Sequence, residues 1–348
     1  MSKDQTLIPA DKLSSFVENV LVAAGVPRAD AGIVSGCLLT ANLSGVDSHG
    51  VIRLAHYIRR LGNGSIKTQP ELRFERRAPS MGIMDGGDGL GHVVTYHACT
   101  EAMKLAEESG SGLVAVRNSS HFGMTGFYIL RIVSQGYVGM MMTDTDAFQI
   151  PFGSRKPFFG TNPLAFGFPT DGIPVLLDFA TTSIPYGKIA LAQTENKPIP
   201  ADWGFDADGN PTTDPHAIAG MHPIAGPKGS GLAMVIDIFC SVLSGMPWGP
   251  HINKMYGELD ARRELGHFIA VFDIKRLMPL DTFKRRLGDM LSEFGDLPPA
   301  EGFDRVYYPG QIEGLRREKR RAEGIPLDPG MYHELAGLGE RFGVPFPG

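Results

Sequence analysis

Residues 47–53 (Asp-Ser-His-Gly-Val-Ile-Arg), followed by Tyr57, contain side chains that could bind and protonate a small organic acid. On a helix, His49, Arg53 and Tyr57 would share one face because they recur every four residues. An arginine binds a carboxylate through parallel N–H donors, and a histidine exchanges protons near neutral pH. The spacing is typical of a site for a 2-hydroxy or 2-oxo acid. It also fits an ordinary helix start, with Ser48 as the N-cap and His49 at the surface.

A second histidine lies in residues 118–123 (Asn-Ser-Ser-His-Phe-Gly). The segment comes between an apolar, strand-like run at 112–116 and a helical pattern at 125–136. Turns between strands and helices often hold catalytic groups, although a loop histidine can also serve only the local structure. Because His121 resembles His49 in standing at the end of an element beside small polar residues, we expect the two to share one site.

Two other segments could bind a phosphate-bearing cofactor. The polar turn within 177–182 (Leu-Asp-Phe-Ala-Thr-Thr) follows a strand pattern and offers backbone N–H groups and hydroxyls. Residues 225–231 (Ala-Gly-Pro-Lys-Gly-Ser-Gly) precede a helical pattern at 229–243. Glycines at a helix N-terminus let the backbone approach an anion, and Lys228 adds a positive charge. Each segment also fits a purely structural turn.

Several familiar motifs are absent from the sequence. Residues 86–91 (Gly-Gly-Asp-Gly-Leu-Gly) come near the Gly-x-Gly-x-x-Gly fingerprint, but the spacing differs and no convincing strand pattern precedes them. The chain has no Gly-x-x-x-x-Gly-Lys-Ser/Thr loop, no Gly-x-Ser-x-Gly elbow and no His-Glu-x-x-His. These absences weigh against an ordinary Rossmann dehydrogenase, a kinase, a serine hydrolase and a metalloprotease.

The periodicity predicts an α/β protein with helices at both ends of the chain. Helical patterns at 11–24, 28–43 and 51–61 make the first 75 residues a helical unit with few strand signals. Helices and short apolar runs then alternate, which is typical of an α/β core. The runs at 164–168 and 175–179 are joined by a turn and predict a hairpin, so the sheet should be mixed.

The later part of the chain returns to polar and helical patterns. Residues 194–217 are rich in Pro, Asp, Asn, Thr and Gly, which predicts a long surface loop. Residues 279–294 are amphipathic, and 313–323 carry a run of arginines and lysines. We interpret that charge run as the solvated face of a helix.

Composition narrows the class of protein. The chain has 348 residues, of which 44 are glycine. Because its net charge is −5, a general nucleic-acid-binding surface is not expected. Three dispersed cysteines (Cys37, Cys99 and Cys240) argue against a disulfide framework or a zinc cage and favour a cytoplasmic protein. No apolar run is long enough to span a membrane, so no membrane partner is expected.

The motifs, taken together and in this order, resemble the malate/L-lactate dehydrogenase family that is unrelated to the Rossmann-type enzymes. The resemblance extends from the first helix to about Pro329. It rests on the motifs at 48–53, 160–164 (Gly-Thr-Asn-Pro-Leu), 178–182, 226–229 (Gly-Pro-Lys-Gly) and 309–311 (Pro-Gly-Gln). Within the family the second half is most similar to the ureidoglycolate dehydrogenases.

The resemblance implies an architecture and a cofactor. The expected fold is a central mixed β-sheet domain of non-Rossmann type at 76–295, which binds NAD or NADP, with NAD favoured. A helical N-terminal subdomain at 1–75 would lie on the substrate side, and a helical segment at 296–348 would pack against it. The family also implies a homodimer or a larger homo-oligomer, with the active site near a subunit contact.

The resemblance also implies roles for individual residues. Substrate would contact Ser48, His49, Arg53 and Tyr57, and the acid/base group would be His121 or His49, since family members differ in which histidine has this role. No metal is implied. The cofactor-binding positions are Thr145, Asp178, Phe179, Ala180, Thr181, Lys228, Gly229, Gly310, Gln311 and Ile312. Ile312 departs from the acidic residue seen in several members, so a side-chain role there is in doubt.

The implied reaction is hydride transfer between C4 of a nicotinamide and the carbinol carbon of a 2-hydroxy acid. Arg53 would hold the carboxylate. His121 would take the hydroxyl proton during oxidation, with His49 polarising or relaying it. The same scaffold could instead act on malate, L-lactate, sulfolactate, a diketo sugar acid or a cyclic ketimine. A binding protein without catalysis is a further alternative.

Overall fold

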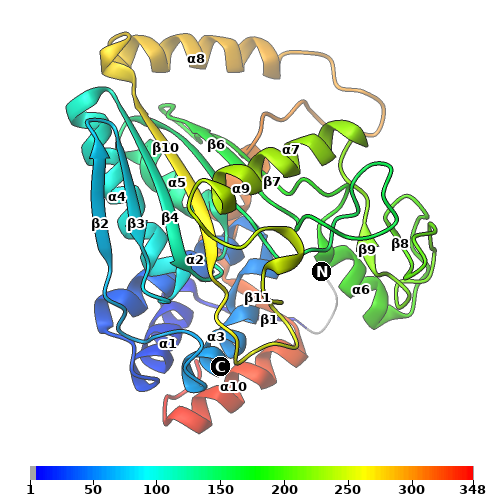
Figure 1. Cartoon of the computed structure of the whole chain (residues 1–348). Coiled ribbons are helices and arrows are strands. Elements are labelled where there is room, and N and C mark those ends of the chain that lie inside the picture. Colours follow the sequence, from blue (N-terminus) through cyan, green and yellow to red (C-terminus); the bar gives the residue numbers. More distant parts are fainter. Residues whose placement is uncertain (1–4, 348) are drawn as a thin grey trace.

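A mixed sheet of seven strands forms the centre of the molecule, whose computed structural model describes residues 5–347 (Figure 1). The strand order is β2-β3-β4-β10-β5-β6-β7. Only β3 and β4 run parallel, and the other neighbouring strands pair antiparallel. The strands are β2 (Arg73–Ala78), β3 (Met81–Asp85), β4 (Ser111–Ser119), β5 (Tyr137–Thr143), β6 (Leu164–Phe168), β7 (Val175–Phe179) and β10 (Leu265–Asp273). The predicted mixed α/β fold and the hairpin are confirmed.

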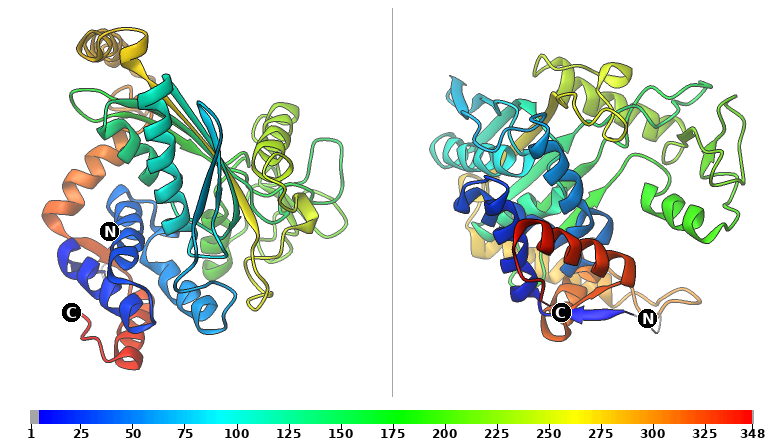
Figure 2. Two further views of the ribbon diagram at one scale, coloured as in Figure 1. Left: turned by 60° about the vertical axis from the view of Figure 1, so that its left-hand side comes forward. Right: turned by 90° about the horizontal axis from the view of Figure 1, so that it is seen from below.

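Helices cover both faces of this sheet, because alternate residues of each strand point to opposite sides. On one face, Val114 and Ile269 pack with helices α4 (Gly91–Ser109) and α5 (Thr125–Ser134). On the other face, Ala115 and Phe268 pack with α7 (Pro227–Asp237) and the π-helical turn Ile238–Val242 that follows it. The left-hand view of Figure 2 shows these two layers on either side of the sheet.

The two ends of the described chain pack together as helices. Strand β1 (Thr6–Ile8) pairs with β11 (Ile325–Leu327), and one hydrophobic cluster joins Phe16 and Leu54 to Leu335. In both views of Figure 2 the blue and red ribbons of the two chain ends lie together. The helices of this region are α1 (Ala10–Ala23), α2 (Arg28–Ser44), α3 (Leu54–Gly62) and α10 (Pro329–Phe342). We therefore propose that residues 1–75 and 296–348 form one unit, set against the α/β unit at 76–295.

Several elements differ from the prediction. The third helix begins at Leu54, because Asp47–His49 and Val51–Arg53 form 3-10 turns instead. The helix expected at 229–243 changes to a π-helix at Ile238. Elements not predicted are β1, β2, β3 and β11 together with α6 (Tyr186–Glu195), β8 (Gly204–Phe205) and β9 (Gly220–Met221). The strands among these are short or carry many charges, so their alternation is weak.

The basic run is only partly a solvated face, contrary to the prediction. It lies on α9 (Gln311–Glu323), which packs against α2. Arg320 binds the carboxylate of Asp47 at 2.7 Å, and Arg317 donates to the hydroxyl of Ser44 at 3.2 Å. The amphipathic segment expected at 279–294 is α8 (Leu280–Gly295). No helix within residues 5–347 is long and apolar enough to cross a membrane.

Candidate active site

The structure brings the two predicted histidines together. The ring centroids of His49 and His121 lie 5.7 Å apart, with an angle of 25° between the rings. The hydroxyl of Tyr57 lies 2.7 Å from Nδ1 of His121, and the hydroxyl of Ser48 lies 3.0 Å from Nδ1 of His49. Two segments far apart in the sequence therefore form one polar cluster.

The tight turn that carries His49 is held by Asn42 of α2. The amide oxygen of Asn42 accepts the N–H of Val51 at 2.8 Å, and its amide nitrogen donates to Asp47 at 2.7 Å. A side chain at Gly50 would collide with Asn42, so a glycine is required there. The prediction that Ser48 caps the third helix is wrong: its hydroxyl contacts His49, and the helix begins after Arg53, whose side chain makes no capping bond.

Arg53 is an unpaired positive charge beside the histidines. Its Nε donates to the carbonyl of Ser48 at 2.6 Å, and no carboxylate within residues 5–347 forms an ion pair with it. Burial lowers the pKa of Arg53, but a guanidinium stays charged at neutral pH. The ring of Tyr256 lies 5.8 Å from the guanidinium carbon. The two terminal nitrogens can therefore bind a carboxylate in a fork.

Both histidines are neutral at neutral pH. Burial, together with the charge of Arg53, lowers the pKa of His49 to about 4. Burial and the neighbouring groups His49 and Arg53 lower the pKa of His121 well below its usual value. A carboxylate bound at Arg53 would offset that positive charge and raise both pKa values toward neutrality. The site is thus suited to move a proton when an acid is bound.

The hydrogen bonds of His121 assign its protonated nitrogen. Its Nδ1 faces the hydroxyl of Tyr57 and, at 3.4 Å, the N–H of Gly123, which can only donate. We therefore assign Nδ1 as the acceptor and Nε2 as the protonated nitrogen. Nε2 makes no hydrogen bond to residues 5–347 and is not enclosed. It is the nitrogen that can reach a bound molecule.

The glycine-rich segment 86–91 supports the turn that carries His121. Contrary to the prediction, the segment does follow a strand, β3, and it leads into α4. The N–H of Gly91 donates to the hydroxyl of Ser120 at 2.8 Å, and that hydroxyl donates to the carbonyl of Gly89 at 2.9 Å. A side chain at Gly91 would collide with the backbone of Ser120. These glycines thus allow close packing beside His121.

On the cofactor side, Thr145 follows the end of β5 and is held by hydrogen bonds to the turn at 160–164. Its N–H donates to Asn162 at 3.1 Å, and its hydroxyl accepts the N–H of Thr161 at 2.8 Å. Asn162 is in turn held by Asp237 at 3.1 Å, and burial raises the pKa of that carboxyl to about 6. The predicted position is therefore rigid.

The polar turn after β7 already has protein partners. Asp178 accepts the N–H of Gly126 at 2.7 Å, near the start of α5, and burial raises the pKa of Asp178 to about 6. The N–H and the hydroxyl of Thr181 both donate to the carbonyl of Thr161, at 2.8 and 3.0 Å. Phe179 and Ala180 are half-buried. Contact of all four with a cofactor stays a prediction.

Two helix N-termini complete the predicted cofactor positions. Lys228 is exposed in the first turn of α7, whereas Gly229 packs so tightly against Ile224 that a side chain would collide. Gly310 precedes α9 with a φ of 86° and packs against Leu176 of β7. The next residues along α9 are Gln311, whose side chain accepts the N–H of Tyr308, and the exposed Ile312.

These positions fit a dinucleotide. The exposed Lys228 in the first turn of α7 is a suitable donor for a phosphate, and the positive end of that helix favours an anion. Within residues 5–347 no group of three or more His, Cys, Asp or Glu side chains is arranged to hold a metal ion.

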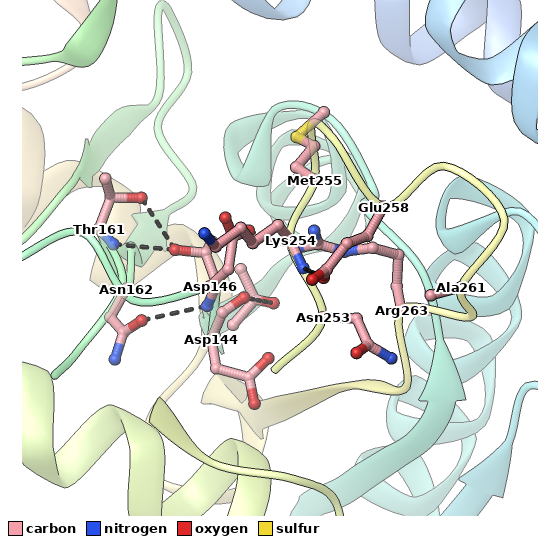
Figure 3. A network of polar contacts seen from close by, with 12 residues as sticks. Asp144, Asp146, Thr161, Asn162, Asn253, Lys254, Met255, Glu258, Ala261 and Arg263 are labelled. Carbon is pink, nitrogen blue, oxygen red and sulfur yellow. Dashed lines mark hydrogen bonds and ion pairs between the residues drawn. The ribbon is translucent and has the colours of Figure 1, made fainter. Parts of the chain in front are cut away.

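Sequence reasoning missed two buried arginines that join the substrate side to the cofactor side. Arg60 of α3 donates to carbonyls of residues 254–261, among them Lys254 at 3.1 Å and Met255 at 2.8 Å. Arg263 pairs with Asp146 at 2.6 Å (Figure 3). The segment between them carries Tyr256. The only signal was that Arg60 falls on the apolar side of its helix.

Comparison with known proteins agrees with this geometry. The family model described as malate/L-lactate dehydrogenase matches residues 8–336. The ureidoglycolate dehydrogenase (NAD(+)) of Escherichia coli K12 is 35% identical over 329 residues, 94% of each chain. The (2R)-3-sulfolactate dehydrogenase (NADP(+)) of Chromohalobacter salexigens is 33% identical, covering 90% of this chain and 92% of that protein.

A solved structure shares the whole fold. The malate dehydrogenase of Pyrococcus horikoshii is 35% identical over 347 residues, covering 97% of this chain and 96% of that protein. Its structure superposes with a TM-score of 0.90 over 99% of this chain and 97% of that one. The chain belongs to the malate/L-lactate dehydrogenase family, whose members are NAD(P)-dependent 2-hydroxy-acid dehydrogenases.

Proposed function

We propose that this protein transfers a hydride between C4 of a nicotinamide and C2 of a 2-hydroxy or 2-oxo acid bound at Arg53. The observation that carries the proposal is the unpaired guanidinium of Arg53 beside the neutral, stacked pair His49 and His121. This combination can bind a carboxylate and transfer a proton to or from the oxygen on the neighbouring carbon.

Each residue has a distinct role in this proposal. Arg53 binds the carboxylate. In reduction His121 carries a proton on both nitrogens, because the bound carboxylate raises its pKa, and Nε2 gives its proton to the C2 oxygen while the Nδ1 proton stays on the ring and faces the hydroxyl oxygen of Tyr57. In oxidation Nε2 of that neutral ring, with the proton on Nδ1, accepts the hydroxyl proton. Tyr57 fixes the His121 ring through the 2.7 Å hydrogen bond to Nδ1. His49, held by Ser48, lies beside His121 and polarises the same oxygen. The nicotinamide, when bound, supplies or accepts the hydride.

The cofactor is NAD or NADP, and we propose that NAD is preferred. The ureidoglycolate dehydrogenase relative uses NAD(+) and the sulfolactate dehydrogenase relative uses NADP(+), and the first is slightly more similar, at 35% against 33% identity. We propose that Thr145, Phe179, Ala180, Lys228 and Gly310 contact it, since these positions surround β7 and the start of α7. The predicted contacts of Gly229, Gln311 and Ile312 stay proposals for the backbone, and those of Asp178 and Thr181 stay proposals for residues that also hold the turn through their own hydrogen bonds.

For the substrate we propose a ureidoglycolate-like acid. Support comes from the 35% identity to ureidoglycolate dehydrogenase, although malate dehydrogenase of Pyrococcus horikoshii has the same identity. Malate, L-lactate and sulfolactate are therefore the first alternatives, followed by a diketo sugar acid or a cyclic ketimine. An acid bound only through Arg53 leaves the remainder of the substrate unspecified.

We further propose a cytoplasmic homodimer. Apolar side chains on α7 and its π-helical extension are about half exposed, and these are Met234, Val235, Ile238, Val242 and Leu243. Contiguous exposed apolar side chains mark an interaction surface. The three cysteines are free and buried, as expected in a reducing compartment.

The test is a substrate panel. Ureidoglycolate, malate, L-lactate, sulfolactate, their 2-oxo partners, a diketo sugar acid and a cyclic ketimine are each assayed with NAD(H) and NADP(H), by absorbance of the reduced nicotinamide. The proposal expects turnover with at least one 2-hydroxy or 2-oxo acid. Turnover of the ketimine alone would replace the acid proposal, and no turnover with tight cofactor binding would favour a binding protein.

A further inference from the structure

His267 lies in the central strand β10 and bridges both neighbouring strands. Its Nδ1 is 2.7 Å from the hydroxyl of Thr143 on β5, and its Nε2 is 2.8 Å from the hydroxyl of Ser119 on β4. The side chain is completely buried. A bulge between Leu265 and His267 changes the register with β4 at this point. One imidazole ring thus ties three strands together.

The two strands that His267 ties together lead directly into the site. Strand β4 ends at Ser119, and His121 follows two residues later. Strand β5 ends at Thr143, and Thr145 also follows two residues later. We call His267 with Ser119 and Thr143 the clamp. It lies where the chain segments of the proton-transfer side and of the cofactor side leave the sheet.

The hydrogen bonds of the clamp favour one tautomer of His267, with the proton on Nδ1. The hydroxyl of Thr143 has carbonyl acceptors at Asp144, 3.1 Å away, and at Gly266, 3.2 Å away. Because these two carbonyls can take the hydroxyl proton of Thr143, whereas the only other acceptor of Ser119, the carbonyl of Ser120, is 3.5 Å away, we assign Nδ1 of His267 as the donor to Thr143. The free Nε2 then accepts the hydroxyl proton of Ser119. Burial lowers the pKa of His267 to about 3, so the ring stays neutral.

A second contact connects His267 to the catalytic turn. The ring of Phe122 meets the imidazole edge to face, with centroids 4.7 Å apart. Phe122 directly follows His121, and its carbonyl accepts the hydroxyl of Tyr128 at 2.5 Å. His267 therefore contacts the segment around His121 on both sides of that residue, through Ser119 and through Phe122.

We infer that His267 is a positioning residue that fixes the place of His121 relative to the cofactor-binding segment at Thr145. The inference rests on the proposed roles of those two residues. His267 itself touches neither the substrate nor the cofactor and takes no part in proton transfer. Its function is to hold the proton donor and the hydride donor at a constant separation, on which a hydride transfer rate depends strongly.

The two hydrogen bonds of His267 can be removed separately. Ser119→Ala removes the partner on the His121 side, and Thr143→Val removes the partner on the Thr145 side while conserving shape. We expect Ser119→Ala to lower kcat roughly 3- to 10-fold with an unchanged Kd for the reduced cofactor. We expect Thr143→Val to raise that Kd roughly 3- to 10-fold. Thr143→Ser keeps the hydroxyl and should restore the wild-type Kd.

Cofactor affinity is measured by fluorescence titration with NADH and NADPH, and kcat with the best acid of the panel. If both variants lower only the melting temperature, or if both change kcat and Kd alike, the positioning role is refuted. A wild-type protein without dehydrogenase activity would refute the proposed function instead, whereas the Thr143→Val effect on cofactor Kd would still test the clamp. His121→Ala, expected to lose turnover while keeping cofactor affinity, separates the two failures.

Discussion

The hydrogen bond between Tyr57 and His121 gives a quantitative prediction for Tyr57→Phe. The hydroxyl is 2.7 Å from Nδ1, whereas the remaining donor, the N–H of Gly123, is 3.4 Å away. Burial raises the pKa of Tyr57, so the hydroxyl remains a donor at every pH of interest. Loss of a buried partner costs about 1–3 kcal/mol. At about 1.4 kcal/mol per tenfold change in rate, kcat should fall about 5- to 150-fold.

The assay is steady-state turnover with the best acid of the panel, because kcat and KM then report different parts of the site. KM for the acid should stay within about twofold, since Arg53 and its bond to Ser48 are intact. Tyr128→Phe is the matched control, as it also removes a buried phenol hydroxyl but leaves the Tyr57 bond in place. Equal kcat values for the two variants would refute the assignment of Tyr57 as the group that orients His121.

Three further predictions follow from buried groups. Within residues 5–347 His92 has no hydrogen-bond partner, and burial lowers its pKa to about 3, so protonation favours the unfolded chain as pH falls below about 6.5. In urea titrations, the free energy of unfolding of His92→Phe minus that of wild type should therefore be about 2 kcal/mol larger at pH 5 than at pH 8, and equal differences at the two pH values would contradict this. Arg60→Gln should speed tryptic cleavage after Lys254, because bonds to the carbonyls there are lost, and unchanged digestion would exclude that role. Gly229→Ala should lower the melting temperature and the cofactor affinity, whereas Gly231→Ala, with open space around it, should be tolerated; similar effects of both would disprove the packing argument.

Much of the fold could be predicted because the local patterns are strong. The runs at 164–168 and 175–179 have the bounds of β6 and β7 because apolar residues end at clear turn signals. By contrast, β2 contains Arg73, Arg76 and Arg77 on an edge of the sheet, and no alternation distinguishes it from a loop. Edge strands are solvated on one side, so their sequences are less constrained.

The candidate site was predicted in its residues but not in its geometry. The intervals of four among His49, Arg53 and Tyr57 predicted a common helix face, whereas His49 lies in a 3-10 turn held by Asn42. The contact of His49 with His121 depends on the packing of α2 beside the sheet, which no local pattern encodes.

Three buried residues were not predicted from the sequence, and for the same physical reason. Arg60, Arg263 and His267 are buried polar groups whose partners are distant in the sequence: backbone carbonyls for Arg60, the carboxylate of Asp146 for Arg263 and hydroxyls for His267. Their residue types are usually exposed, so the sequence favours a surface interpretation for each of them. Only the tertiary structure shows where their partners lie, and Nε and one terminal nitrogen of Arg263 have no hydrogen-bond partner within residues 5–347.

The central claim is that a hydride passes between the nicotinamide and C2 of an acid held at Arg53. The most direct test is reduction of the 2-oxo acids of the panel with cofactor deuterated at C4, with the product analysed by mass spectrometry and proton NMR. We expect one deuterium at C2 of the hydroxy acid. In Arg53→Lys we expect a large rise in KM for the acid, because the forked carboxylate contact is lost. No transfer of deuterium to any acid, or transfer with an unchanged KM in that variant, would contradict it.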